Sequence, residues 1–465
     1  MTASTARRPV APYNPKYDPM TDARIGRGSE YAPTYWIGTA GAPPEDDGPV
    51  QADMDVDVVV IGSGYTGLSC ALHLAKEFGI KAHVLEANGV AYGCSTRNGG
   101  QAQISSGRLK RSQWIERWGL DVAKGLHAEV VEAFELFRGL IRDHAIDCAP
   151  QDGGHYYIAH KGWMMPRLAK EAALLRDTFG YGARMLSRDE LHQTAVRDME
   201  AHGAMWEPDG TAIHAAKLAF GYMRAARELG ARIHVDSPVE AWETKDGVHH
   251  LRTPGGTVRA RAVAVATAGY APRSLHPRLR DRIMPIMSNS ITTRVLSAAE
   301  LEACGFRVHS PLTDTRTLRH YYRLLPDNRV QIGSRAAITG RDADNPAHLA
   351  GLREGLARKF PALRGIPLDY SWWGWVDVSH DMMPRITAMP GLPNAYYALG
   401  YGGNGVMYSA QAGRRMAQMV AGRDGDVPNL PIFRNELPHE GWKTPFRRLG
   451  QWGLYKLYHY QDERG

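Results

Sequence analysis

A glycine-rich loop between a buried strand and a helix constrains this chain more than any other feature of its sequence. The unbroken apolar run at 57–61 predicts a buried parallel strand, and the loop after it reads Gly62-Ser63-Gly64-Tyr65-Thr66-Gly67. A helix is expected at 68–78 and a second strand at 81–86, which ends in Glu86. The glycines allow a tight turn and a close approach to a pyrophosphate, and the acid binds ribose hydroxyls. Together these features predict a dinucleotide site of the Rossmann type.

The rest of the chain predicts an α/β fold, α+β overall, in which an antiparallel sheet is inserted into the nucleotide-binding domain. Apolar spacing predicts helices at 111–145, 164–180, 212–229 and 409–421. Strands are expected at 232–235, 239–244, 249–266 (a hairpin), 290–295, 320–325, 329–333 and 395–399. The expected division is an irregular arm (1–50), three nucleotide-binding segments (51–110, 206–274 and 376–435), a helical and substrate-domain segment (111–205), an antiparallel substrate domain (275–375) and a helical tail (436–465).

Composition narrows the classes of function. Of the 465 residues 43% are hydrophobic and 23% charged, which is typical of a soluble chain with more than one packed domain. The net charge of +7 comes from scattered Lys and Arg, so no nucleic-acid partner is expected. No apolar run reaches the ~18 residues of a spanning helix. The four cysteines match neither a metal motif nor a disulfide framework, which favours a cytoplasmic protein without a metal: Cys70, Cys94, Cys148 and Cys304.

Further motifs span nearly the whole chain. Residues 91–101 read Ala-Tyr-Gly-Cys-Ser-Thr-Arg-Asn-Gly-Gly-Gln, and the other motifs are Pro33–Trp36, Ala268–Tyr270, Tyr321–Arg323, Trp373-Gly374, Asp381–Pro384 and Gly400–Val406. In this order they resemble the D-amino-acid-oxidase-like family of glycine and sarcosine oxidase type, and most closely the branch that contains gamma-glutamylputrescine oxidoreductase. The resemblance implies FAD as cofactor, oxidation of an amine or amino acid, and a substrate sheet placed over the flavin.

The motifs also supply the expected FAD-binding residues. They are Gly62, Ser63, Gly64, Thr66, Gly67, Glu86, Ser95, Thr96, Arg97, Asn98, Gly99, Gly100, Gln101, Val239, Gly269, Gly402, Gly403, Asn404, Gly405 and Val406. The resemblance implies that some members attach the flavin through a His in the first loop or a Cys before the last one. Residues 95–98 hold no His and 372–390 hold no Cys, so non-covalent FAD is expected, with Cys94 a small buried thiol.

Aromatic residues of the middle segment are the candidates for the substrate wall. They are Tyr321, Tyr322, Trp373, Trp375 and His380, and strand alternation allows only one of the two tyrosines to face the site. An aromatic wall attracts an ammonium group before it loses its proton. A surface ion pair is the expected role of Arg335, and binding an acidic group at the far end of the substrate is the alternative.

Two positions depart from the sarcosine-oxidase pattern. The resemblance places Gln331 where those relatives carry a Lys that speeds the reaction with O2, and Met407 where they bind the substrate carboxylate with a Lys. The first loss leaves open whether electrons pass to O2 or to another acceptor such as a quinone. The second favours an amine over an α-amino acid as substrate. A non-catalytic flavin-binding protein is the remaining alternative, and the oligomeric state is left open.

Two further features are assigned to structure. His249 and His250 lie beside a turn and are expected to be exposed to solvent. Residues 445–460 alternate basic and aromatic side chains at helical spacing, which favours a helix packed on the body over one that touches a membrane surface.

Overall fold

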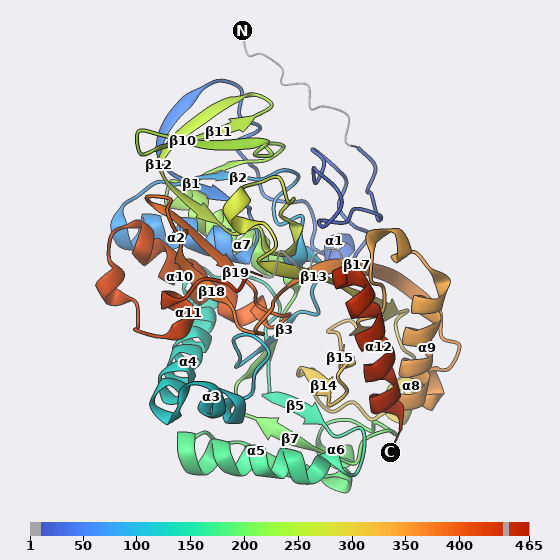
Figure 1. The fold of residues 1–465 in the computed structure, drawn as a ribbon. Coiled ribbons are helices and arrows are strands. Elements are labelled where there is room, and N and C mark those ends of the chain that lie inside the picture. Colours follow the sequence, from blue (N-terminus) through green and yellow to red (C-terminus); the bar gives the residue numbers. More distant parts are fainter. Residues whose placement is uncertain (1–10, 440–445, 465) are drawn as a thin grey trace.

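A computed structural model describes residues 11–439 and 446–464 of the chain. The described residues form two large sheets, one mainly parallel and one mainly antiparallel, with a small three-stranded sheet between the two halves (Figure 1). The mainly parallel sheet and its helices hold both glycine loops. The antiparallel sheet lies beyond them, with helices α5, α6, α8 and α9 on its outer side.

The mainly parallel sheet is the nucleotide-binding layer. Its strands run in the order β10-β11-β12-β1-β2-β9, and β19 pairs with both β12 and β18. β1 pairs in parallel with β2 and β12 through its buried Val and Ile residues, as unbroken apolar runs do in sheets covered on both faces. The strands are β1 (Met54–Ile61), β2 (His83–Leu85), β9 (Arg232–His234), β10 (Ala241–Lys245), β11 (Val248–Thr253), β12 (Gly256–Val265), β18 (Arg385–Ala388) and β19 (Ala395–Leu399).

The second large sheet joins two distant parts of the chain. Its order is β17-β13-β16-β15-β14-β5-β7-β6, and the pairing of β5 with β14 is parallel. Its strands are β5 (His155–Ile158), β6 (Arg184–Ser187), β7 (Gly203–Glu207), β13 (Ile283–Thr293), β14 (Leu312–Asp314), β15 (Tyr321–Leu324), β16 (Val330–Ser334) and β17 (Leu368–Ser379). The small sheet contains β3 (Gln101–Gln103), β4 (Gln151–Asp152) and β8 (Gly210–Ala212).

The two faces of the antiparallel sheet differ in polarity. One face carries Leu312, Tyr322, Ile332 and Ile291, which belong to an apolar cluster covered by α9. The opposite face carries hydroxyls and amides and is turned toward the glycine loops. Strand alternation therefore separates a packing face from a face that is free to bind ligands.

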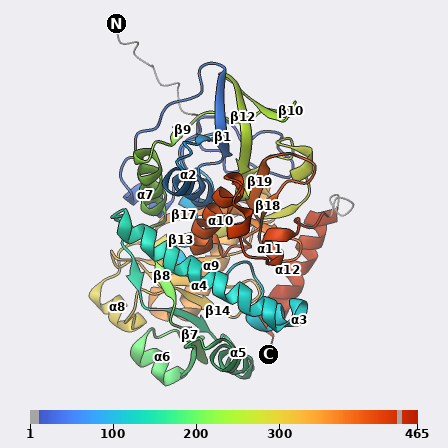
Figure 2. The same ribbon diagram turned by 90° about the vertical axis from the view of Figure 1, so that its left-hand side faces the viewer.

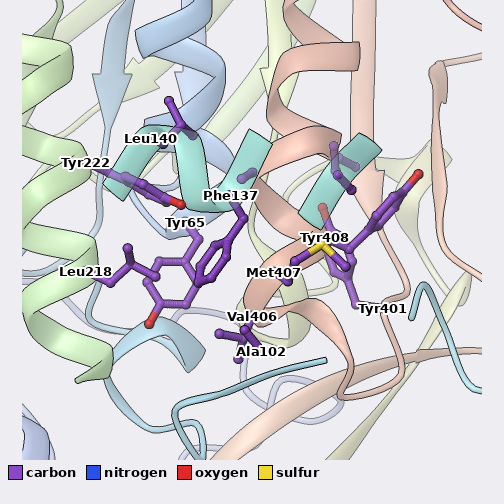
Figure 3. Packing of buried hydrophobic residues seen from close by; sticks show 14 of the residues in the cluster. Tyr65, Ala102, Phe137, Leu140, Leu218, Tyr222, Tyr401, Val406, Met407 and Tyr408 are labelled. Atoms are coloured by element: carbon purple, nitrogen blue, oxygen red, sulfur yellow. The ribbon is translucent and has the colours of Figure 1, made fainter. Parts of the chain in front are cut away.

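Helices cover the parallel sheet and form the largest apolar cluster. α2 packs against α7 and α10, and α10 also packs against α4 (Figures 2 and 3). The helices are α1 (Tyr35–Thr39), α2 (Tyr65–Phe78), α3 (Arg111–Trp118), α4 (Leu120–Asp143), α5 (Met164–Phe179), α6 (Arg188–Thr194), α7 (Ala215–Glu228), α8 (Ala298–Cys304), α9 (Pro346–Lys359), α10 (Gly405–Val420), α11 (Pro431–Arg434) and α12 (Arg447–Glu463). Among the described residues, none of these helices is both long and apolar enough to cross a membrane.

Several local expectations change in the structure. The expected helix at 111–145 is divided into α3 and α4 by Gly119, whose φ is +82°. β13 begins seven residues before the expected start, and β17 has no counterpart among the expected strands. His249 is buried rather than exposed, because its ring hydrogen bonds to the Pro393 carbonyl and to Thr244. The division into numbered domains stays a prediction.

The N-terminal arm and the C-terminal helix both lie on the body. The Trp373 and Trp375 indoles donate to the backbone oxygens of Pro15 and Tyr17 in the arm. On α12, Arg448 pairs with Asp18 at 2.8 Å, and the Asp462 carboxylate accepts from two backbone amides of the 315–320 loop. The expected packing of the tail helix on the body therefore holds for residues 446–464; its residues 440–445 and 465 lie outside the described ones.

Candidate active site

The first glycine loop has the geometry of a close-packed turn between strand and helix. Gly62 has a φ of +101°, and a Cβ on it would lie 2.7 Å from the Ala266 carbonyl oxygen. A Cβ on Gly67 would overlap the carbonyl oxygen of Gly62. The N-cap residue Gly64 of α2 has no capping side chain, although the Ser95 hydroxyl accepts from the Tyr65 amide at 3.0 Å. The positive end of the helix faces the cavity that Gly64 and Ser95 line, where it favours an anionic ligand.

Glu86 follows β2 and lines a cavity beside this loop. Its buried carboxylate accepts hydrogen bonds from the Ser63 amide at 3.0 Å, the Ser63 hydroxyl at 2.7 Å and the Asn88 amide at 3.2 Å. Val239 lines the same cavity, and residues 23–27 of the N-terminal arm line it as well. The arm therefore contributes to a site that the sequence assigned only to the Rossmann unit.

A second cavity lies between the glycine loops and the polar face of the antiparallel sheet. α10 begins at its edge, and the N-cap residue Asn404 makes no side-chain capping bond, so a second positive helix end is directed toward the cavity. The expected residues that line it are Gly64, Thr66, Ser95, Arg97, Asn98, Gly99, Gln101, Gly402, Gly403, Asn404, Gly405 and Val406, together with Tyr321.

The two cavities are continuous. Both are lined by Gly64, Cys94, Ser95, Ala266 and Ala268. These five residues include the N-cap residue of α2, so a ligand that fills both cavities passes this helix end. One end of the combined space meets Glu86, and the other meets the antiparallel sheet.

Tyr321 forms the wall of the second cavity. Its hydroxyl hydrogen bonds to Ser288 at 2.9 Å and to Ser290 at 2.8 Å on β13. The ring lies so close to Gly99 that a Cβ there would be 2.9 Å from it, and a Cβ on Gly333 would overlap it. Two glycines and two hydroxyls therefore fix both the plane and the phenol oxygen of this side chain.

Four of the five expected substrate-wall residues lie elsewhere. Tyr322 points into the apolar cluster on the opposite face, where its hydroxyl donates to Asp198. Trp373 and Trp375 lie on the face of β17 that packs against the N-terminal arm. His380 follows β17 and does not line the cavity. These are corrections, and strand alternation is the cause, because Gly374 and Val376 occupy the cavity side of β17.

Some expected FAD-binding residues support the loops from behind instead of lining the cavities. The Ser63 hydroxyl joins Glu86 to the Ala91 amide, and the Thr96 hydroxyl donates to the Ala91 carbonyl. The glycines at 67, 100 and 269 allow backbone segments to approach one another, since a Cβ on each would lie within 3.2 Å of another segment's backbone. Their role is to shape the loops.

Three other positions differ from their expected roles. Met407 lies in the apolar cluster beside Tyr408 and does not line the cavity (Figure 3). Gln331 lies opposite Arg323 on the polar face of the sheet, where it is buried, but it does not line the cavity either. Arg335 lines the cavity, and its expected surface ion pair is absent among the described residues.

Several residues that line the second cavity carry no recognisable signal in the sequence. Ser288 fell outside the expected strand at 290–295, and Asp377 lies on β17, which was not expected. Burial raises the pKa of the Asp377 carboxyl to about 7, although the Gly400 amide donates to it at 2.6 Å. Arg108 and Arg319 lie in loops, and no local pattern marks them as neighbours of Arg335.

Comparison with known proteins shows the family to which the chain belongs. A family model described as "FAD dependent oxidoreductase" matches residues 57–419. The chain belongs to this family of FAD-dependent oxidoreductases. It is 32% identical to gamma-glutamylputrescine oxidoreductase of Escherichia coli (strain K12) over 430 residues, which cover 91% of this chain and 97% of that one. The expected family, Rossmann-type fold, cofactor and enzymatic nature are thereby confirmed.

Several solved structures share the fold of this chain. Glycine oxidase from Geobacillus kaustophilus matches with a TM-score of 0.68 at 20% identity, over 83% of this chain and 100% of that one. L-proline dehydrogenase from P. horikoshii matches with a TM-score of 0.66 at 17% identity, over 83% and 96%. The same fold therefore occurs in proteins named oxidase and dehydrogenase, so the fold does not determine the electron acceptor.

The continuous cavity fits FAD in its chemistry. Glu86 provides a buried carboxylate at one end, where a ribose offers hydroxyl donors. The N-terminal end of α2 lies where the two cavities meet and would supply the positive potential that a diphosphate needs. The uncapped start of α10 lies near the far end, where a flavin ring gains negative charge on reduction. Burial raises the pKa of the Cys94 thiol to about 12, which keeps it protonated and a poor nucleophile.

Proposed function

We propose that the chain oxidises the C–N bond of a small amine. Bound FAD would accept a hydride at N5 from the carbon next to the amine nitrogen, and the product imine would be hydrolysed. The observation that carries the proposal is the wall around Tyr321, which stands across the cavity from the glycine loops that would hold the flavin. The name of the Escherichia coli relative, gamma-glutamylputrescine oxidoreductase, supports an amine as the substrate class.

The residues around the cavity would hold FAD without a covalent bond. Glu86 and Val239 would contact the adenosine end, Gly64 and Ser95 the diphosphate, and Gly402–Val406 the pyrimidine end of the flavin. Cys94 lines both cavities, but its protonated thiol does not favour attachment. Precipitation with acid followed by absorbance of the supernatant tests this point: free FAD is expected, and a yellow pellet would contradict it.

The protein's own residues would orient the amine and keep water away. The Tyr321 ring presents a π face to an ammonium group, and its hydroxyl is fixed by Ser288 and Ser290. Gly374 and Val376 leave room beside this ring on the cavity side of β17. The substrate carbon would thus be positioned in a site of limited solvent access, which is the main task of the protein in hydride transfer.

Electron transfer to O2, giving H2O2, is the proposed reoxidation. Transfer to a quinone or another carrier is the second candidate, because Gln331 stands at the position that the resemblance assigns to an oxygen-activating Lys. Gln331 is buried beside Arg323, so the expected lysine position is not a cavity position in this chain. The oxygen step of the reaction distinguishes the two candidates.

Anaerobic absorbance spectra of the purified protein with a panel of amines and amino acids test the proposal. Bleaching of the flavin band by putrescine-type amines, but not by sarcosine or D-amino acids, is the expected result. Air is then readmitted: fast recovery with formation of H2O2 supports an oxidase, and slow recovery supports a dehydrogenase. Bleaching by amino acids alone would overturn the amine assignment, and bleaching by no compound would favour a non-catalytic flavoprotein.

A further inference from the structure

Exposed apolar side chains are concentrated on one element of the molecule, the C-terminal helix α12. Six of the twelve large apolar side chains that are exposed in the described parts of the chain lie at positions 446–460. Large exposed apolar patches mark surfaces that bind a partner or a membrane. Five of the six lie on one side of the helix, are between 48% and 67% exposed, and are here called the apolar strip: Phe446, Leu449, Trp452, Leu457 and Tyr460.

The polarity of α12 is the reverse of that of an ordinary surface helix, which turns its apolar face to the core. The buried residues of α12 are Arg447, Gln451 and Asp462, and all three are polar. Arg447 donates to the Asp281 carbonyl oxygen at 2.8 Å, and the Asp462 carboxylate accepts from two backbone amides of the 315–320 loop. Polar contacts therefore hold the helix on the body, and packing on the body does not account for the apolar strip.

Cations accompany the apolar strip. The Lys456 ammonium lies 6.0 Å from the centre of the Trp452 ring, and the Arg464 guanidinium lies 4.2 Å from that of Tyr460. Lys456 has no acidic group within ion-pair distance among the residues that the structure describes. A lysine or arginine beside an aromatic ring can keep its charged end in water while its stem and the ring contact apolar material.

The two acids of α12 do not balance these cations, because both are engaged on the body. Asp462 is buried against the 315–320 loop. The Glu463 carboxylate lies 3.3 Å from Arg358 and 3.4 Å from Arg316. The outward side of the helix therefore combines apolar and aromatic side chains with positive charge, which is complementary to a surface that is apolar beneath and anionic on top.

The surface beside the C-terminal end of α12 has the same character. The Lys161 ammonium donates to the Glu463 carbonyl oxygen at 3.3 Å. Trp163 nearby is 43% exposed, and the Arg167 guanidinium lies 4.6 Å from its ring. Both views of the ribbon place α12 on the outside of the molecule (Figures 1 and 2). Indole and phenol rings next to cations are the side chains that gather at the headgroup level of a bilayer.

We propose that α12 docks the protein on the surface of an anionic lipid membrane. The apolar strip would enter the boundary between headgroups and acyl chains, and Lys456 and Arg464 would contact the anionic headgroups. A second copy of the chain is the other candidate to cover the strip, but a symmetric pair would bring the same positive charges against each other. The proposal concerns an interaction surface and does not depend on the reaction proposed above.

Sedimentation with lipid vesicles tests the proposal on the flavin-loaded protein. Vesicles of phosphatidylcholine and phosphatidylglycerol in equal amounts are compared with vesicles of phosphatidylcholine alone. Binding is expected to be at least about fivefold stronger to the anionic vesicles and to weaken as the salt concentration rises. No binding to either kind of vesicle, or equal binding to both, would overturn the proposal.

Substitutions on the outward side of α12 assign the binding to this helix. Leu449→Ser is expected to weaken binding to anionic vesicles about tenfold, because an apolar side chain no longer leaves water. Lys456→Gln should weaken it about fivefold and leave binding to phosphatidylcholine unchanged. Leu120→Ser is the matched control, since Leu120 is also exposed, at 41%, but lies at the start of α4. All three should keep their flavin, and wild-type binding by both α12 variants would overturn the proposal.

Two further measurements separate a membrane from a second copy of the chain. Brominated lipids in the anionic vesicles are expected to quench part of the tryptophan emission, and Trp452→Phe should remove most of the quenched part. Quenching that is the same in Trp452→Phe and in the wild type would contradict insertion of the apolar strip. Analytical ultracentrifugation without lipid gives the opposite test. Self-association that Leu449→Ser abolishes, in a protein that binds no vesicles, would assign the strip to a second copy and overturn the proposal.

Discussion

At the end near Glu86 the cavity is lined by the first glycine loop and by apolar residues, with Arg24 and Arg27 of the arm, whereas at the end near Tyr321 it is lined by hydroxyls, a phenol ring and four arginines. The first end depends on glycines that permit close approach, such as Gly62 with its φ of +101°. The second end depends on which side chains the strands direct toward it. A site that depends on glycines and close backbone contact suits a cofactor that a whole family shares. A site that depends on the direction of side chains suits a substrate that differs among relatives.

Substitutions at the two ends of the cavity should also differ in their effect on stability. Backbone amides and helix ends reach a diphosphate only if no Cβ intervenes, so substitutions near Gly67 affect folding and cofactor binding together. Around Tyr321 the polar face carries hydroxyls and glycines in place of apolar side chains. Substitutions there should change the kinetics with little loss of stability, and the four predictions below test this separation.

The largest effect is expected for Gly67→Ala. The added Cβ would overlap the Gly62 carbonyl oxygen, so α2 must move away from β1. We expect loss of bound flavin and a fall of more than ~3 kcal/mol in the free energy of unfolding. The ratio of flavin to protein absorbance and chemical denaturation measure the two effects. Gly351→Ala in α9 is the control, because its Cβ meets no atom within 4 Å. Flavin loss in the control as well would contradict the assignment of the effect to the overlap between Gly67 and Gly62.

A smaller effect, which depends on pH, is expected for Asp377→Asn. Burial raises the pKa of this carboxyl from 3.8 to about 7, so the folded state keeps the proton over a range in which the unfolded chain has lost it. Wild-type stability therefore falls as the pH rises from about 4 to about 7 and stays at the lower level above that range. The variant lacks this loss.

Denaturation of both proteins at pH 5 and pH 8 tests this sign. The stability of Asp377→Asn relative to the wild type is expected to increase by about 2 kcal/mol between the two pH values. Asn retains an oxygen that accepts from the Gly400 amide, so the loop at 400–402 should keep its shape. A difference that does not change with pH would mean that Asp377 does not titrate in this range.

Substitution of the two adjacent tyrosines of β15 should change the kinetics in one case and the stability in the other. Tyr321→Phe removes the bonds to Ser288 and Ser290 and is expected to lower kcat/KM about tenfold, because the ring is no longer fixed, with flavin content unchanged. Tyr322→Phe removes the donor to Asp198 and is expected to lower stability by about 1–2 kcal/mol with unchanged kinetics. The free energy of unfolding and the rate of flavin reduction are measured for both variants. If both variants change in the same quantity, the division of the sheet into a packing face and a cavity face is wrong.

The sequence predicted the strand, glycine loop and helix of the Rossmann unit well because they are contiguous. Strand, glycine loop, helix and Glu86 lie within about thirty residues, and short-range spacing is enough to identify them. The start of α10 at Gly405 was expected at 409, since glycines weaken the helical signal even where they form the first turn.

The substrate end was predicted less well because its determinants are far apart. Alternation shows that Tyr321 and Tyr322 point in opposite directions, but only the packing of the sheet against α9 decides which of them faces the cavity. For Trp373 and Trp375 as well, alternation alone does not show that their face of β17 packs against the arm. Arg108 and Arg335 line the same cavity but are more than two hundred positions apart, so no local pattern connects them.

The smallest effect is expected for Trp373→Phe, on the face of β17 that lies against the arm. The indole donates to the Pro15 carbonyl at 3.2 Å, so its loss should lower the stability by about 1 kcal/mol. The rate of flavin reduction should stay within about twofold of the wild type, because the neighbouring Gly374, not Trp373, lines the cavity. Ser288→Ala on the facing strand β13 is the matched comparison and should show the reverse: lower kcat/KM with nearly unchanged stability. If Trp373→Phe changes kcat/KM as much as Ser288→Ala does, the arm and the substrate wall are coupled, and the assignment of one face to packing and the other to catalysis is too simple.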